Sequence, residues 1–218
     1  MITTYNPQAT GDVLMITLGP STGVEQVNQQ GQVVRITDGN TGAVVAFNIL
    51  DYGQELGIDG QSGQIFLDQK QVDQANKILD EAGFTTQLAP NPSKLTIGYV
   101  ESVAPHPDSD HLQITQTTVG QDQNLQIVSG SPNMKAGIKV VVAQPGSMMP
   151  SGNVIWAGEL RGIPSAGMIV SGRELQLPGA PNRPGALVLP DDFGEVGEVF
   201  NFNAGRQLYQ DGKIDTNY

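Results

Sequence analysis

Both histidines of the chain lie in one short segment, residues 106–111, together with two carboxylates. The segment reads His106, Pro107, Asp108, Ser109, Asp110 and His111. Imidazole and carboxylate side chains at this spacing could hold a metal ion. Because the chain has no cysteine and no further histidine, they cannot be completed to a zinc shell, and a carboxylate-and-water site for a hard cation is the form left open. Pro105, just before the segment, and Pro107, within it, keep these side chains from sharing a helix face. They favour a structured loop between strands, and we expect no metal site.

A second segment, residues 160–175, combines a cation, hydroxyls and glycines. Arg161 offers a guanidinium that can hold phosphate, and Ser165 and Ser171 offer hydroxyls. Glycines within the segment allow a backbone to approach a ligand closely. A β-bulge and a turn would explain the same residues, so this segment alone does not define a site.

Motifs for nucleotide hydrolysis and for nucleophilic catalysis are missing. The Gly/Pro turns at 130–133, 144–146 and 150–152 lack the Gly-Lys-Ser or Gly-Lys-Thr ending of a phosphate loop, and no Gly-x-Ser-x-Gly elbow occurs. The lone Trp156 is more typical of a core residue than of a stacking platform. We therefore expect a protein that is not an enzyme and that needs no cofactor.

The composition is acidic but sparsely charged. The 218 residues hold 11 Lys and Arg against 22 Asp and Glu, for a net charge of -11, and 21 Gln supply much of the polarity. A pI near 4.4 argues against a nucleic-acid binder that works by bulk charge. The absence of cysteine, of a signal peptide at residues 1–7 and of an apolar run of membrane-spanning length predicts a soluble cytoplasmic protein.

The elements needed to position these segments are mostly strands. β-rich runs at 12–18, 32–36 and 43–50 predict a small sheet, and apolar residues at helical spacing predict one helix over 68–83. Further β-rich runs predict a small barrel. They lie at 95–103, 112–119, 125–128, 138–143, 154–160 and 168–170.

Two domains follow from this order of elements. We predict a β-dominated chain with an α+β domain over 1–88, a small β-barrel domain over 89–200 and a polar tail over 201–218. The prolines between residues 84 and 94 mark the boundary. The excess of acid lies mainly in the first domain, where residues 1–93 hold 3 basic and 10 acidic groups, against 6 and 10 over 94–200.

Four motifs taken in order carry a family resemblance. They are residues 106–112, 126–133, 136–146 and 160–175. This series resembles the tRNA-binding OB-fold domain of the phenylalanyl-tRNA synthetase β-subunit and of the methionyl-tRNA synthetase C-terminal appendix. With the acidic leading domain, the chain resembles the YtpR family of bacterial tRNA-binding proteins.

The resemblance implies non-catalytic binding of tRNA by shape and backbone. It places a tRNA-binding surface at Arg161, Ser165, Met168 and Ser171, with Asn133 and Lys139 nearby. His111 stands where many relatives have a lysine and completes the predicted site. The resemblance also implies a homodimer, and we expect neither DNA nor a membrane as a partner.

A protein-interaction module is the alternative reading. A chain of net charge -11 could keep the OB-fold and bind a protein or a small ligand in place of RNA. The dependence of binding on salt separates the two readings, because phosphate contacts release counterions and apolar contacts do not.

Overall fold

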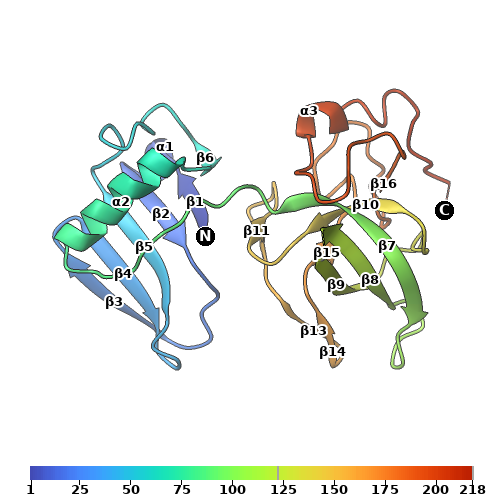
Figure 1. Ribbon diagram of the computed structural model, residues 1–218, viewed down its shortest axis with the longest axis horizontal. Coiled ribbons are helices and arrows are strands. Elements are labelled where there is room, and N and C mark those ends of the chain that lie inside the picture. Colours follow the sequence, from blue (N-terminus) through green and yellow to red (C-terminus); the bar gives the residue numbers. More distant parts are fainter. Residues whose placement is uncertain (122, 218) are drawn as a thin grey trace. The chain divides into compact units, whose positions relative to one another are not determined.

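The computed structural model describes residues 1–121 and 123–217 and divides the chain into two compact units (Figure 1). Unit 1 is Met1–Pro92 and unit 2 is Ser93–Tyr218. The division falls four residues after the boundary expected at 88/89. The reason is local, since Leu88 is buried in unit 1 and exchanges two hydrogen bonds with the Asn76 side chain, and Asn91 donates to the carbonyl of Met1.

Unit 1 is an antiparallel six-stranded sheet with one long helix against it. The strand order is β3-β4-β5-β2-β1-β6. The bounds are β1 Ile2–Tyr5, β2 Val13–Thr17, β3 Glu25–Gln30, β4 Val33–Asp38, β5 Val44–Leu50 and β6 Gly63–Ile65, with a short helix α1 at Pro7–Thr10.

Helix α2, Gln69–Glu81, covers one face of this sheet (Figure 1). Asp68 and Gln71 form a capping box, in which the Asp68 carboxylate accepts from the Gln71 N–H and the Gln71 side chain accepts from the Asp68 N–H. The apolar face of α2 packs against the inward-facing side chains of β2 and β5, and this contact holds the helix on the sheet. This is the helix that the sequence predicts over 68–83. The main contributors are Val72, Ala75, Ile78, Leu79, Leu14, Ile16, Phe47 and Ile49.

A buried carboxylate holds the loop between β2 and β3. Asp38 is 2% exposed and accepts hydrogen bonds from backbone N–H groups of Thr22, Thr41, Asn40 and Gly23. These donors, the Thr22 N–H first and the Thr41 N–H next, hold the pKa of Asp38 well below its ordinary value. Asp38 must therefore be ionised for this loop to keep its geometry.

Unit 2 is built on a five-stranded antiparallel sheet of order β15-β10-β7-β8-β9, with β16 also paired to β10. The hairpins β11–β12 and β13–β14 stand beside it. The bounds are β7 Leu95–Pro105, β8 Gln113–Gly120, β9 Gln123–Ser129, β10 Lys139–Ala143, β11 Ser147–Met148, β12 Val154–Ile155, β13 Gly158–Leu160, β14 Ile163–Ser165, β15 Met168–Ile169 and β16 Val188–Leu189.

The strand ladders of unit 2 leave its sheet open. Within the described residues, no ladder joins β9 to β15, whereas the sequence suggests a closed barrel. Three hydrogen bonds join β9 to β14 and the residue after it instead. Ala166 N–H donates to Gln126 O at 2.8 Å, Gln126 Nε2 donates to Pro164 O at 2.9 Å, and Val128 N–H donates to Ser165 Oγ at 3.1 Å. The short length of β15 limits regular pairing at this point.

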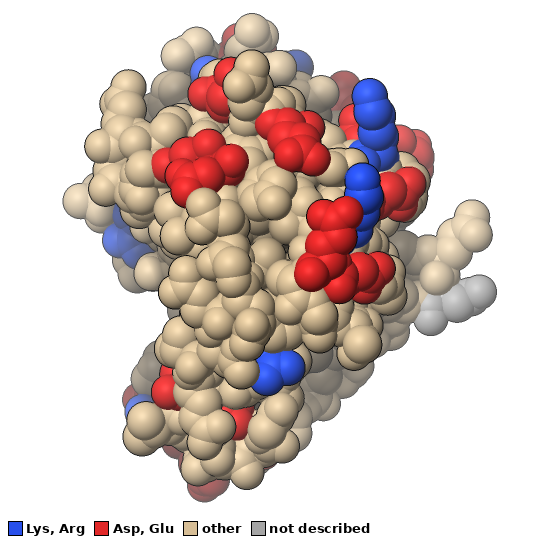
Figure 2. Space-filling model, turned by 90° about the vertical axis from the view of Figure 1, so that its left-hand side faces the viewer, with Lys and Arg blue, Asp and Glu red and all other residues tan. Residues whose placement is uncertain are grey.

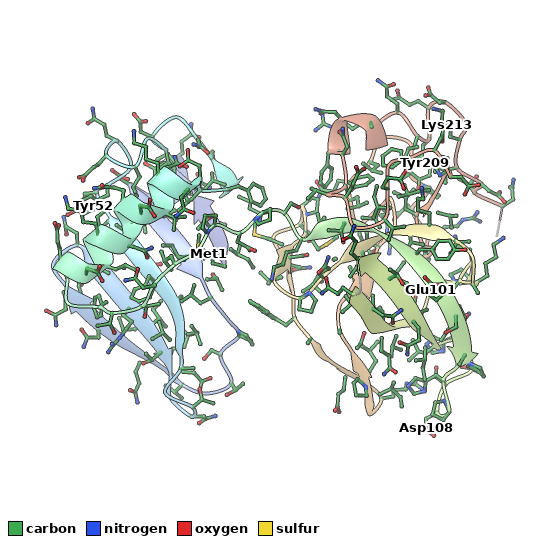
Figure 3. All side chains as sticks on the ribbon, viewed as in Figure 1. Met1, Tyr52, Glu101, Asp108, Tyr209 and Lys213 are labelled. Atoms are coloured by element: carbon green, nitrogen blue, oxygen red, sulfur yellow. The ribbon has the colours of Figure 1, made fainter. Side chains whose placement is uncertain are left out.

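Residues 201–217, which the sequence suggests as a polar tail, pack on the core of unit 2. Helix α3, Phe202–Gly205, leads into a segment whose Leu208 and Ile214 are buried in the same core as Leu95 and Phe200. Tyr209, labelled in Figure 3, packs partly buried against that core. Because the segment is mostly polar, its composition does not indicate that Leu208 and Ile214 are buried.

Only 15% of the residues are charged, so much of the surface must be uncharged. The face drawn in Figure 2 is mostly free of charge and carries more acidic than basic groups. No helix in the described part of the chain is long and apolar enough to cross a membrane.

Candidate functional site

A groove of about 240 Å³ runs along unit 2 where the end of β9 faces β15 and the turn after it. Its wall combines hydroxyls, one cation, one carboxylate and several apolar side chains. These lining residues include Ser129, Ser131, Ser171, Arg173, Glu174, Leu160 and Met168. Unit 1 has hollows of similar size, about 270 and 310 Å³, so size alone does not distinguish the groove.

The turn at Ser171–Glu174 shapes one wall of the groove. The Ser171 N–H and hydroxyl both donate to the Glu174 carboxylate, at 2.7 and 2.8 Å, and the Glu174 N–H donates back to Ser171 Oγ at 3.1 Å. Because Ser171 is 6% exposed and its hydroxyl is already engaged, it organises the turn. The exposed member of this turn is Arg173, whose Nη1 lies 3.5 Å from Asn182 Oδ1.

Arg161 stands at the tip of the β13–β14 hairpin beside the groove residue Leu160. The two turn residues, Arg161 and Gly162, have φ of 48° and 80°, the left-handed values that a tight hairpin turn requires. Arg161 Nη1 donates to the carbonyl oxygen of Asp108 at 2.7 Å. Asp108 lies in the loop between β7 and β8 (Figure 3), so the hairpin and this loop are joined.

His106 makes a second connection between the same loop and the same hairpin. Its Nδ1 accepts from the Asp108 N–H at 3.1 Å, which leaves Nε2 to donate to the carbonyl oxygen of Leu160 at 3.1 Å. The ring is 3% exposed, and both nitrogens are used in holding the loop. Among the described residues, no three His, Cys, Asp or Glu side chains gather to hold a metal ion.

His111 is exposed at the end of this loop. Its Nδ1 lies 3.0 Å from Asp110 Oδ1. The pKa of Asp110 is lowered, chiefly by the hydrogen bond from the His111 side chain and next by a hydrogen bond from its own backbone N–H. Electrostatic interactions with His111 and with Arg161 lower it further. The field of Arg161 therefore reaches the His111–Asp110 pair, and the loop combines cations with carboxylates that offset them.

Three of the predicted residues serve the framework of unit 2. Ser165 is 4% exposed and links β9 to β14 through Val128 N–H. Asn133 exchanges two hydrogen bonds with the backbone of Ala186, at 2.8 and 2.9 Å. Lys139 donates from Nζ to the carbonyl oxygens of Asp191 and Gly194, at 2.6 and 2.7 Å, which ties its charge to another loop.

The structure places Met168 and Ser171 in the groove and Arg161 next to the groove residue Leu160. His111 lies at the end of the 106–111 loop, which Arg161 contacts through Asp108. Sequence reasoning missed Arg173 as a site residue, although it stands two positions after Ser171 in the same segment. It also missed Ser129 and Ser131, which line the groove. Ser129 is the last residue of β9, where it pairs with Gln113 of β8, and Ser131 follows in the next turn.

Each unit matches one family model. Residues 20–91 match a domain of unknown function, and residues 95–198 match the family described as "Putative tRNA binding domain". The crystal structure of the C-terminal domain of Plasmodium vivax p43 is similar with a TM-score of 0.36 and 27% identity, and the similarity covers 50% of this chain and 60% of that chain.

Several curated relatives are more similar in sequence. The chain is 43% identical over 201 residues to "Putative tRNA-binding protein YtpR" of Bacillus subtilis, with 91% of this chain and 98% of that protein covered. It is 41% identical over 113 residues to the phenylalanine–tRNA ligase β subunit of Lactiplantibacillus plantarum, covering 50% of this chain and 14% of that subunit. The β subunit of Oceanobacillus iheyensis is 46% identical over 128 residues, covering 59% and 14%.

Unit 2 is thus similar to a domain class that occurs both inside a synthetase subunit and in a free-standing protein. Because the similarity to YtpR extends over nearly the whole of both chains, this protein belongs to the YtpR family. The family predicted from the four sequence motifs is confirmed.

Proposed function

We propose that unit 2 binds tRNA at the groove and its rim without catalysing a reaction. The observation that carries the proposal is the placement of Arg161 beside the groove wall formed by Leu160, Met168 and Ser171, within the span similar to tRNA-binding domains. Arg161 and Arg173 are both exposed, and their planar guanidinium groups suit phosphate oxygens.

The predicted residues divide by role in this proposal. Arg161 and His111 contact the backbone of the RNA, with Arg173 added from the structure. Met168 lies half-buried in the groove wall, where its thioether can contact a ribose or a base edge. Ser165, Ser171, Asn133 and Lys139 hold the surface in shape through the hydrogen bonds described above.

The proposed framework is an OB-type barrel that closes through single hydrogen bonds. The bonds of Ala166 to Gln126 and of Val128 to Ser165 support closure between β9 and the β14–β15 segment. Gly167 permits the close approach of this segment to the end of β10, because a Cβ there would lie 2.7 Å from the Ala143 carbonyl oxygen at a φ of 126°. A domain of this kind acting on tRNA implies a cytoplasmic protein that needs no cofactor.

A protein partner is the second candidate, and one observation favours it. Leu160 is 40% exposed beside Met168, so the rim offers apolar surface as well as charge. The carboxylates Asp108 and Asp110 on the same loop would also oppose RNA. Such a partner would be held mainly by apolar contact, with little dependence on salt.

A titration of total tRNA at several salt concentrations tests the proposal. If two or three phosphates are neutralised, the slope of log K against log salt should be about -2 on the single-strand estimate, much shallower than for a basic RNA binder. Fluorescence anisotropy with labelled tRNA would measure it. Absence of binding at low salt would contradict the proposal and leave the protein-partner reading.

A further inference from the structure

Strand β3 is an open edge of the unit 1 sheet. It stands at the end of the strand order (Figure 1). All six of its residues are exposed. Val27 is 68% exposed, and Val24, just before the strand, is 86% exposed. An edge strand of this length offers a row of unpaired backbone groups to a further strand.

The usual protection of sheet edges is missing from β3. Its sequence, Glu-Gln-Val-Asn-Gln-Gln, has no lysine, arginine or proline, and the register of β3 with β4 is continuous without a bulge. The opposite edge, β6, has only three residues. One edge of the sheet is therefore protected by its shortness, and the other is long and unprotected.

The turn between β3 and β4 defines which backbone groups point outward. Gly31 and Gln32 form a two-residue connection with Gly31 at a φ of 57°, and Gln30 pairs with Val33. Such a connection makes Gln30 and Val33 a hydrogen-bonded pair, and the pattern then alternates along the strand. The N–H and C=O groups of Glu25, Val27 and Gln29 consequently face away from β4.

We propose that β3 pairs antiparallel with β3 of a second copy of this chain, about a two-fold axis at Val27. In this register Val27 meets Val27 of the other copy as a hydrogen-bonded pair. Glu25 faces Gln29, and Gln26 faces Asn28. The unit 1 sheets of the two copies would then form one continuous sheet.

The side chains of β3 favour its own copy over an arbitrary strand. The Gln29 amide can donate to the Glu25 carboxylate on both sides of the axis, and the Gln26 and Asn28 amides can pair. Val27 lies next to the half-buried Ile36 on the face away from α2, so a valine pair would extend an apolar row.

Charge does not oppose this register, although the chain carries -11. Glu25 is the only charged residue of β3. At ~3.4 Å per residue, the two Glu25 carboxylates would lie about 14 Å apart along the strands. This separation exceeds the screening length of about 8 Å at physiological ionic strength.

Sedimentation equilibrium of the full chain tests the proposal. The wild type should show a reversible monomer–dimer equilibrium. V27K and V27E place like charges opposite each other at the axis and should each raise the dimer dissociation constant by at least about tenfold. An equimolar mixture of V27K and V27E should restore dimers, because opposite charges then meet. Gln61→Lys makes the same charge change as V27K at an exposed position outside the strands and should leave dimerisation unchanged.

Three results would overturn the proposal. One is a wild type that stays monomeric at high micromolar concentration. Another is a V27K dimer as stable as the wild type, and the third is a mixture of the two variants that stays monomeric. Circular dichroism would verify folding, which substitution of an exposed residue should not affect. Hydrogen exchange adds an independent readout: the amides of Glu25, Val27 and Gln29 should lose protection on dilution, while those of Gln26 and Asn28 should keep it.

Discussion

Arg161 and Asp108 are joined by a hydrogen bond of 2.7 Å from the guanidinium Nη1 to the backbone carbonyl oxygen. This bond connects the tip of the β13–β14 hairpin to the loop after β7, so two motifs separated by about fifty residues form one surface. Because only Nη1 is engaged by this contact, the remaining guanidinium N–H groups can still donate to a phosphate.

Replacement of Arg161 by alanine should weaken tRNA binding by about 1–3 kcal/mol, the range for a hydrogen bond to a charged group. The slope of log K against log salt should flatten by roughly one unit, since one phosphate contact is lost. Lys77→Ala removes a cation from an exposed position on α2 of unit 1 and serves as the control. An equal effect of both variants would indicate that net charge, not the rim, determines affinity.

His111→Lys should strengthen tRNA binding and steepen the salt slope, because a permanent cation would stand at the end of the 106–111 loop. His111→Gln keeps a polar side chain without introducing a permanent cation and should not steepen the slope. Anisotropy titrations of the three proteins at matched salt would compare them. If the His111→Lys variant binds tRNA more weakly than the wild type, His111 is not part of the proposed tRNA-binding surface.

Ser165→Ala should destabilise unit 2 by about 1–3 kcal/mol, because the buried N–H of Val128 loses its acceptor. tRNA affinity should fall without a change in salt slope, since no charge is removed. Urea denaturation followed by Trp156 fluorescence would measure the stability. Ser151→Ala, at an exposed turn residue, provides a matched control.

Acid should loosen the β2–β3 loop through Asp38. The pKa of Asp38 is lowered in the folded state, so its stabilising contribution is present above the unfolded pKa of about 4 and is lost as pH falls through the folded pKa. The amide resonances of Thr22 and Gly23 should report this change in an NMR titration. Asp38→Asn should destabilise the loop at neutral pH and abolish that acid transition, and an unchanged transition would assign it to another group.

Limited proteolysis should cut the chain first within residues 89–93. Leu88 is buried and bonded to Asn76, which protects the chain before that point, and Pro90 and Pro92 keep the following backbone extended. Mass spectrometry after brief treatment with a broad-specificity protease would locate the cut. First cleavage elsewhere would contradict the assignment of this segment as the exposed connection.

The local patterns of the sequence predicted the elements that depend on local physics. The helix over 68–83 was visible because an apolar stripe and a capping residue are short-range features, and the structure has α2 at Gln69–Glu81. Strands β2, β4 and β5 of unit 1 and the longer strands of unit 2 were predicted because β-branched runs alternate with Gly and Pro turns. Strands β1, β3 and β6 were missed. The apolar anchors Leu208 and Ile214 were missed because two side chains within a polar segment form no periodic pattern.

The sequence by itself determined the family and the residues available for a site, because four motifs of specific type and order are written along the chain. Only the tertiary structure decided what each residue does. It brought Arg161 to Asp108 and placed Arg173 at the groove, while Ser165, Asn133 and Lys139 became tied to backbone groups far along the chain. The physical reason is that a side chain's availability depends on which donors and acceptors folding brings within hydrogen-bond distance. Spacing along the sequence does not contain that information.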